Sequence, residues 1–349
     1  MKKNLVLLRL LKASFGRWFP GLPVARTIVR CVQGAVLSAA LVPLGTLHLS
    51  AAEPANVPAN APAAVLATVD GVAITERQVQ RELDRAISGR NLPPAAVASL
   101  RDATLKQLID RRLVAAFMQT YGFGAQPQEI DRQLQRVRKQ LEEQQRTLDQ
   151  YLQQAGLSLN ELRDNLAWDI AWPRLLERYL TDENLERYFR QHHRDYDGTE
   201  VSVAHILLRI DSPDDPQSRE TTIAAARQLR EWIQAGELSF VRAAQQYSVA
   251  PTAAEAGRLG FIRRREPMPE AFSQAAFALE PETISPPVVT EAGVHLIQCL
   301  EIKPGSLGWQ DVRAELEPAV TRHLFRWAAD RQRPHAKIEV HDAKQAPAD

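Results

Sequence analysis

Two strand-like segments, each with a histidine among apolar residues, constrain this chain more than any other feature. One covers residues 201–208 and the other residues 289–299. Because side chains alternate between the two faces of a β-strand, His205 lies on the same face as Val203, and His295 on the same face as Cys299. Both imidazoles can therefore point into one shared interior. A lone buried histidine is usually a hydrogen-bonded core residue, and the pattern leaves open whether this pair stabilises the fold or takes part in chemistry.

The residues between 75 and 193 follow a helical pattern instead. Apolar residues recur there at three- and four-residue spacing, the period of one helix face. Pro173 predicts a kink or a division in the fourth helix, whereas the third is expected to run unbroken to Gly156. We expect five helices, which begin at the caps or prolines Thr75, Pro94, Pro127, Ser158 and Thr181.

The N-terminal 52 residues have the layout of a targeting segment. They carry seven cations and no acid, followed by the charge-free run 31–49 and the small residues Ser50-Ala51-Ala52. This run is near the length that spans a bilayer, so an uncleaved membrane anchor is the alternative to a signal peptide. Residues 53–64 then form a proline- and alanine-rich linker.

Composition excludes several classes of function. Without the first 52 residues, 36 cations face 42 acids, a formal charge of −6, which argues against nucleic acid as a partner. One cysteine, Cys299, is left, so an internal disulfide is excluded. No cluster of cysteine and histidine has metal-ligand spacing, and no glycine-rich phosphate loop occurs. The sequence therefore predicts neither a metal nor a cofactor.

Two further motifs lie between the histidine segments. One is residues 256–261, Ala-Gly-Arg-Leu-Gly-Phe, and the other is residues 268–279, which begin Met-Pro-Glu-Ala-Phe. Together with the histidine segments they resemble the parvulin family of peptidyl-prolyl isomerases over residues 201–302. The helical part, with Val-Asp-Gly-Val-Ala-Ile-Thr at residues 69–75, looks like the helical arms of secreted parvulin foldases.

The resemblance implies an α+β fold. A parvulin domain, with a four-stranded antiparallel sheet and surrounding helices, would be inserted in or appended to an all-α chaperone-like domain. A C-terminal helix beginning near Trp309 and a strand at 336–340 would return to complete the helical domain, the strand pairing with the one near Val65. The implied boundaries are 1–52 for a signal peptide or membrane anchor, 53–64 for the linker, 65–198 for the helical domain, 199–303 for the parvulin domain, 304–340 for the C-terminal helix and strand, and 341–349 for a disordered tail.

The resemblance also implies a site for prolyl isomerisation. Amide resonance sets a barrier of about 18–20 kcal/mol, and a catalyst needs only an apolar cup for the proline ring and a polar network that stabilises the twisted amide. No nucleophile, metal or cofactor is required. The implied residues are the catalytic group His205, His295 and Thr290 and the substrate-binding group Leu259, Met268, Phe272 and Ser248.

Three features of the sequence, one residue and two segments, qualify this interpretation. Where the family has a cysteine or aspartate facing the prolyl amide, this chain has Ala250, and Ser248 is the nearby hydroxyl expected to substitute in part. The loop 211–216 is strongly acidic and would repel a phosphopeptide, so the site is expected to be independent of phosphorylation. The run Arg263–Arg265 is interpreted as a solvated loop, with a grip on acidic client segments as the alternative.

Two functions from different classes follow. The first is an exported foldase that isomerises X-Pro bonds in unfolded clients, which the helical domain binds. The second, favoured by Ala250, is a non-catalytic holdase that uses a degenerate parvulin domain as a peptide-binding module. The expected partners are unfolded or nascent exported polypeptides with proline-containing segments. The expected location is the periplasm or cell envelope, with or without a membrane anchor.

Overall fold

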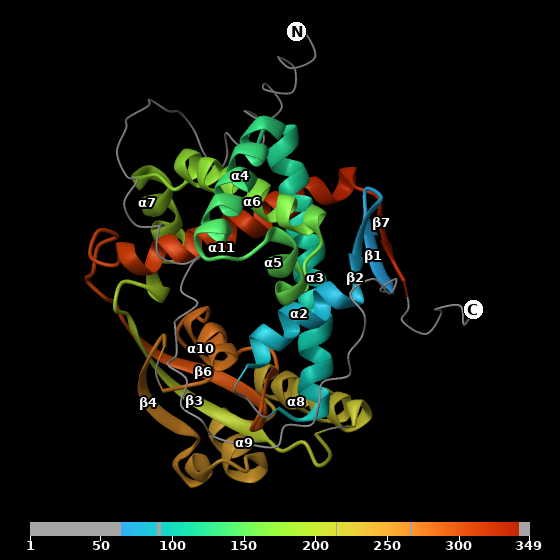
Figure 1. Ribbon diagram of the computed structural model, residues 1–349. Helices are drawn as coiled ribbons and strands as arrows, with labels where there is room; N and C mark the ends of the chain where they lie inside the picture. The colour runs from blue at the N-terminus through green and yellow to red at the C-terminus, as the bar shows by residue number, and fades with distance from the viewer. Residues whose placement is uncertain (1–63, 89–91, 214, 266, 342–349) are drawn as a thin grey trace, which may run out of the picture. The chain divides into compact units, whose positions relative to one another are not determined.

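The computed structural model describes residues 64–88, 92–213, 215–265 and 267–341 (Figure 1). The predicted signal peptide or anchor and nearly all of the predicted linker and tail lie outside these residues. Within the described ranges, no helix has both the length and the apolar content needed to cross a membrane.

A three-stranded antiparallel sheet joins the two ends of the described chain. β1 (Val65–Val69) turns back into β2 (Val72–Thr75), and β7 (Ile338–Val340) lies on the other side of β1. Asp70 and Gly71, which form the turn, both have positive φ, as a tight two-residue hairpin requires. The expected pairing of the C-terminal strand with the first strand is thus confirmed. The second strand of the hairpin was not predicted.

Capping boxes define helix starts in the N-terminal half. α2 (Glu76–Ile87) begins where predicted, because the side chain of Thr75 accepts from the backbone of Gln78 and the Gln78 side chain accepts from the backbone of Thr75. α3 (Pro94–Thr120) begins at a proline. An N–H at the first position of a helix has no carbonyl within the helix to donate to, so proline, which lacks this N–H, fits there without loss.

The prediction of one helix from Pro127 to Gly156 is wrong. The structure has two, α4 (Pro127–Glu143) and α5 (Leu148–Ala155). Gln145 between them has a φ of 55°, a left-handed conformation that a helix does not continue through. Thr147 then forms a capping box with the backbone and side chain of Gln150 and starts α5.

Proline does not divide the next helix. α6 (Leu159–Tyr179) starts at the predicted cap Ser158 and runs through Pro173. The stacked indoles of Trp168 and Trp172, 5.2 Å apart, both contact the ring of Phe325, so apolar packing supports the helix around the proline. The helical run then closes with α7 (Asp182–Gln191) and the 3₁₀ helix η1 (His193–Asp195).

The C-terminal helix α11 (Arg313–Gln332) packs against α3, far away in sequence. The rings of Trp327 and Phe117 meet in a T-shaped arrangement, with centroids 5.2 Å apart. A short 3₁₀ helix, η3 (Arg333–His335), then leads into β7. The core shared by β1, β2, α2, α3, α6 and α11 includes Leu66, Ile74, Val79, Leu113, Phe117, Leu175, Leu324 and Ala328.

A separate four-stranded antiparallel sheet, in the order β4-β3-β6-β5, confirms the predicted α+β fold class (Figure 1). Its strands are β3 (Glu200–Leu208), β4 (Arg258–Arg263), β5 (Val288–Thr290) and β6 (Gly293–Lys303). Its helices are α8 (Pro216–Gln234), α9 (Phe240–Tyr247), the 3₁₀ helix η2 (Pro251–Glu255) and α10 (Glu270–Phe277).

Strand alternation gives this sheet two cores. Ala204 and Ile206 pack with α8 and α9 on one face. Val203 and Cys299 pack with Phe272 of α10 on the other. The sheet is thus covered on both faces, and the α10 face is the one toward which the sequence pattern directs both histidines.

The chain enters and leaves the four-stranded part through two adjacent segments. The backbone N–H of Leu307 donates to the carbonyl of Asp197, 3.0 Å away, and that of Gly305 donates to the hydroxyl of Thr199, 3.1 Å away. A Cβ at position 305 would lie 2.0 Å from the Asp197 carbonyl oxygen. Only glycine at position 305 therefore permits the two segments to come this close.

We predict that Phe117→Ala lowers the free energy of unfolding by about 3–5 kcal/mol, since the ring is 1% exposed and joins α3 to α11. Urea unfolding followed by circular dichroism measures this. Leu159→Ala is the control, because Leu159 is 41% exposed. A loss below about 1 kcal/mol at position 117 would contradict the assignment of the core.

Candidate functional site

The register of β3 on β6 brings the two predicted histidines together. His205 lies opposite Ile297, and His295 opposite Leu207, so the imidazoles are diagonal neighbours on one face. The two Nδ1 atoms are 3.2 Å apart, and the rings lie nearly parallel with centroids 5.4 Å apart. Both residues are buried. The prediction that they share one interior is therefore confirmed.

Each imidazole also has a hydroxyl at its outer nitrogen. The Oγ1 of Thr290 lies 2.7 Å from Nε2 of His295, as the family resemblance implied. The Oγ1 of Thr252 lies 3.4 Å from Nε2 of His205. Thr252 was not among the predicted residues. It comes two positions after Ala250, and only the turn of η2 directs it back towards β3.

These four groups form one chain of hydrogen bonds. A contact between two Nδ1 atoms requires that one donates and the other accepts, so the neutral rings hold opposite tautomers. The ring that donates through Nδ1 must then accept at Nε2, and its partner must donate there. A hydroxyl can donate or accept, so Thr252 and Thr290 satisfy either direction of the chain. All four ring nitrogens have a partner.

Burial keeps this pair uncharged. It lowers the pKa of His205 below its ordinary value. Burial, together with the neighbouring His205, lowers the pKa of His295 to about 4. At neutral pH both rings are therefore neutral, as expected for two imidazoles in direct contact.

The predicted apolar cup adjoins the pair. Phe272 is fully buried, and its ring meets both imidazoles edge to face, at 5.7 Å from His205 and 5.3 Å from His295. Leu259 and Met268 are half-buried and pack against the cluster that contains Phe272. The structure thus brings the three cup residues and the histidine pair to one place, with Leu259 and Met268 partly open to solvent.

Ser248 and Ala250 lie in a segment that is hydrogen-bonded to the end of β3. The Oγ of Ser248 accepts from the backbone N–H groups of Leu207, 3.0 Å away, and of Ala250, 3.2 Å away. The Ala250 methyl is itself buried. Ser248 therefore ties this segment to the end of β3, and its contact with substrate stays a prediction.

Gly257 lets the segment before β4 touch the backbone of His205. The N–H of His205 donates to the Gly257 carbonyl over 2.8 Å. Gly257 has a φ of 73°, and a Cβ there would lie 2.1 Å from the His205 carbonyl oxygen, so a side chain is excluded. Its neighbour Ala256 also has positive φ, 59°, which strains a residue with a Cβ.

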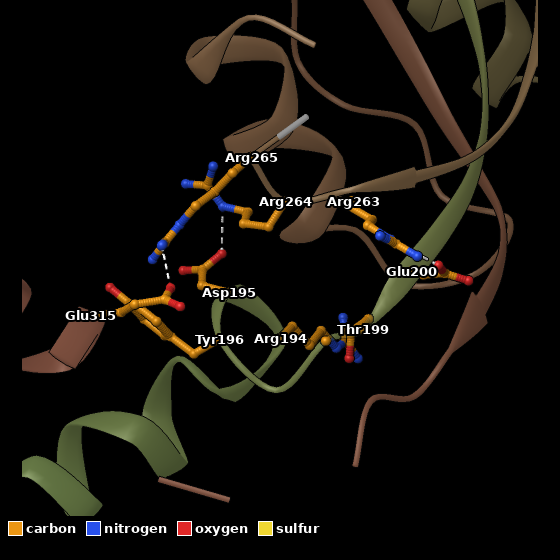
Figure 2. A pocket seen from close by; sticks show the side chains of 10 residues that line it. Arg194, Asp195, Tyr196, Thr199, Glu200, Arg263, Arg264, Arg265 and Glu315 are labelled. Carbon is orange, nitrogen blue, oxygen red and sulfur yellow. Dashed lines mark hydrogen bonds and ion pairs between the residues drawn. The ribbon is translucent and has the colours of Figure 1, made fainter. Parts of the chain in front are cut away.

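A cavity of about 340 Å³ lies elsewhere, where η1 meets the end of β4 and the start of α11 (Figure 2). None of the seven predicted site residues lines it. Within the described ranges, no group of histidine, cysteine, aspartate and glutamate side chains is arranged to hold a metal ion.

The lowered histidine pKa values make stability depend on pH. Between about pH 6.5 and pH 4 the unfolded chain binds protons that the folded pair does not, so stability falls as pH decreases through this range. We predict a loss on the order of 3 kcal/mol from His295, measured by urea unfolding at stepped pH. His295→Gln should flatten the profile, and the exposed control His341→Gln should leave it unchanged. Equal slopes in all three proteins would contradict the assignment.

Two segments of the chain match known protein families. Residues 205–301 match the family described as the PPIC-type PPIASE domain, and residues 30–176 match the SurA-like N-terminal domain.

Two of the curated relatives match between two thirds and three quarters of this chain. Chaperone SurA of Aromatoleum aromaticum is 27% identical over 272 residues, which cover 75% of this chain and 60% of that protein. Chaperone SurA of Cupriavidus pinatubonensis is 29% identical over 251 residues, covering 67% of this chain and 49% of the relative. The chain thus spans less than two thirds of the length of these relatives.

Solved structures include similar proteins. A PpiC-type peptidyl-prolyl cis-trans isomerase domain is 28% identical and covers 31% of this chain and 95% of its own, with a TM-score of 0.28. PrsA from Bacillus subtilis is 21% identical and covers 80% of this chain and 95% of its own, with a TM-score of 0.26. By these family matches, this chain combines a PPIC-type, parvulin-family domain with a SurA-like N-terminal domain.

Proposed function

We propose that this chain is an exported foldase that accelerates cis–trans isomerisation of X-Pro bonds in unfolded client proteins. The observation that carries the proposal is the neutral pair His205–His295, hydrogen-bonded at both ends to hydroxyls and packed against the ring of Phe272. The SurA-like half would bind the client, and the cationic first 52 residues would direct export. We also propose the domain boundaries predicted from the sequence, including residues 199–303 for the parvulin domain.

The geometry suits a reaction that breaks no covalent bond. Twisting the prolyl amide ends its resonance and concentrates charge on the carbonyl oxygen and nitrogen. A preorganised polar network beside an apolar cup stabilises that state more than the planar amide. Leu259, Met268 and Phe272 would hold the ring and exclude water. The hydrogen-bonded chain from Thr252 to Thr290 would supply the oriented dipoles.

Thr252 would compensate in part for Ala250. The buried methyl of Ala250 has no hydrogen-bonding group to offer the amide. Thr252 is half-buried, and its hydroxyl is already oriented by His205. The hydroxyl would therefore be the polar group nearest to the substrate on this segment, in the role that the sequence assigned to Ser248.

The alternative function, a holdase without isomerase activity, is favoured by Ala250 and agrees with the name Chaperone SurA that the curated relatives carry. A parvulin-type pocket that lacks the acid or thiol would still bind proline-containing segments through its apolar cup. The two functions differ in rate enhancement and not in binding. The acidic loop 211–216 would repel phosphorylated clients, so client binding would be independent of phosphorylation under either function.

The first test is isomerisation of a proline-containing peptide by the full chain. Wild type should exceed the uncatalysed rate, and Thr252→Val, which removes one hydroxyl at constant shape, should reduce kcat/KM roughly three- to tenfold. Thr252→Ser is the matched control and should retain the wild-type rate, because it keeps the hydroxyl. A wild-type rate equal to the uncatalysed one would exclude the enzyme.

The second test restores a polar group at position 250. Ala250→Asp or Ala250→Cys should raise kcat/KM by up to roughly tenfold, since either side chain would place a polar group beside the amide. Aggregation of an unfolded client, followed by light scattering, is measured in parallel. Suppression of aggregation by wild type, with no isomerisation in wild type or either variant, would establish the holdase instead.

A further inference from the structure

The loop between β4 and α10 carries Met268, which packs against the cluster that contains Phe272 and forms one wall of the cup. Met268 lies between Pro267 and Pro269, which have no N–H to donate. Among the described residues, the hydroxyl of Ser273 donates to the Met268 carbonyl over 3.5 Å, the limit of such contacts. Apart from its packing against the Phe272 cluster, the position of Met268 therefore depends on side chains that hold the two ends of the loop.

Arg264 holds those ends together. Its Nη1 and Nη2 donate to the two carboxylate oxygens of Glu270, the first residue of α10, over 2.9 and 2.7 Å. Its Nε donates to Asp195 over 2.7 Å. The Arg264 side chain is only 14% exposed. A bidentate pair of this kind fixes direction as well as distance, so the guanidinium closes the base of the loop.

The same guanidinium joins the loop to the segment that leads into the four-stranded sheet. Asp195 ends η1, before β3 begins. The neighbouring Arg265 pairs with Glu315 of α11, and its guanidinium lies 5.4 Å from the ring of Tyr196 (Figure 2). The loop is thus anchored from outside the segment that carries the cup.

The arginine run is therefore not an open anion site. Arg263 pairs with Glu200, Arg264 with Asp195 and Glu270, and Arg265 with Glu315. All three guanidinium groups face carboxylates of the same chain, and Arg264 is largely buried. Neither a solvated loop nor a grip on acidic clients describes Arg264.

We propose that Arg264 is a positioning residue for the prolyl cup, which it acts on by fixing the loop that carries Met268. The expected effect on substrate binding rests on the proposed function, whereas the geometry of the loop does not. Without Arg264, the hydrogen bonds that tie the start of the loop to Glu270 and Asp195 would be lost, so the two ends of the loop would no longer be held together. Met268 would then leave the wall of the cup.

The methionines give a direct probe of this loop. The chain has three, Met1, Met118 and Met268. Met118 is 1% exposed in the helical core, so its ¹³C-methyl NMR signal is an internal standard for folding. We expect Arg264→Gln and Glu270→Gln to shift or broaden the Met268 signal and leave that of Met118 in place. Arg264→Lys should be intermediate, because one ammonium cannot reproduce the bidentate fork.

The matched control is Arg263→Gln, since Arg263 precedes Arg264 in the chain, is 78% exposed and pairs with Glu200 instead. It should leave both signals unchanged. In the peptide assay, Arg264→Gln should raise KM roughly three- to tenfold and leave kcat close to wild type, because the cup binds the ring in ground and transition states alike.

Two outcomes would overturn the inference. One is a wild-type Met268 signal in both Arg264→Gln and Glu270→Gln when the Met118 signal shows a folded chain. The other is a fall in kcat at constant KM. Absence of isomerase activity in wild type would remove the proposed function only, because the methyl signals report the loop without turnover.

Discussion

The hydrogen bond between the imidazoles of His205 and His295 is the contact around which the four-stranded part is organised. It exists because β6 lies on β3 in one register, and a slip by one residue would turn one histidine to the opposite face. β5 adds Thr290 to it, and η2 adds Thr252. The close approach of Gly257 fixes the chain beside His205. The edge strand β5, the 3₁₀ helix η2 and Gly257 thus all support one chain of hydrogen bonds centred on the histidine pair.

Strand alternation predicted which face carries the histidines, and the capping residues Thr75 and Ser158 predicted helix starts, because these signals are local. The break at Gln145 was missed because apolar spacing continues across it, although Thr147 and Gln150 already had the spacing of a cap. The cup and the histidine pair were identified from family motifs. Composition alone would have described Leu259, Met268 and Phe272 as ordinary core.

Thr252 and Arg264 could not be predicted in the same way. The contact of Thr252 with His205 depends on how η2 turns, which no periodic pattern records. The burial of Arg264 depends on acids at positions 195 and 270, one at the end of η1 and one at the start of α10. In the sequence the three consecutive arginines look alike, and only the positions of their partners distinguish them.

The neutrality of the histidine pair agrees with the chemistry proposed for it. An acid–base catalyst needs a pKa near the working pH, whereas burial holds the pKa of His295 at about 4. Isomerisation moves no proton between catalyst and substrate, so the pair loses nothing by staying neutral. In the proposed reaction the pair would contribute orientation, because each imidazole holds the next hydroxyl in a direction that is already set in the folded protein. A polar group at position 250 would then add to a network that is complete without it, and Ala250 would limit the rate without abolishing the site.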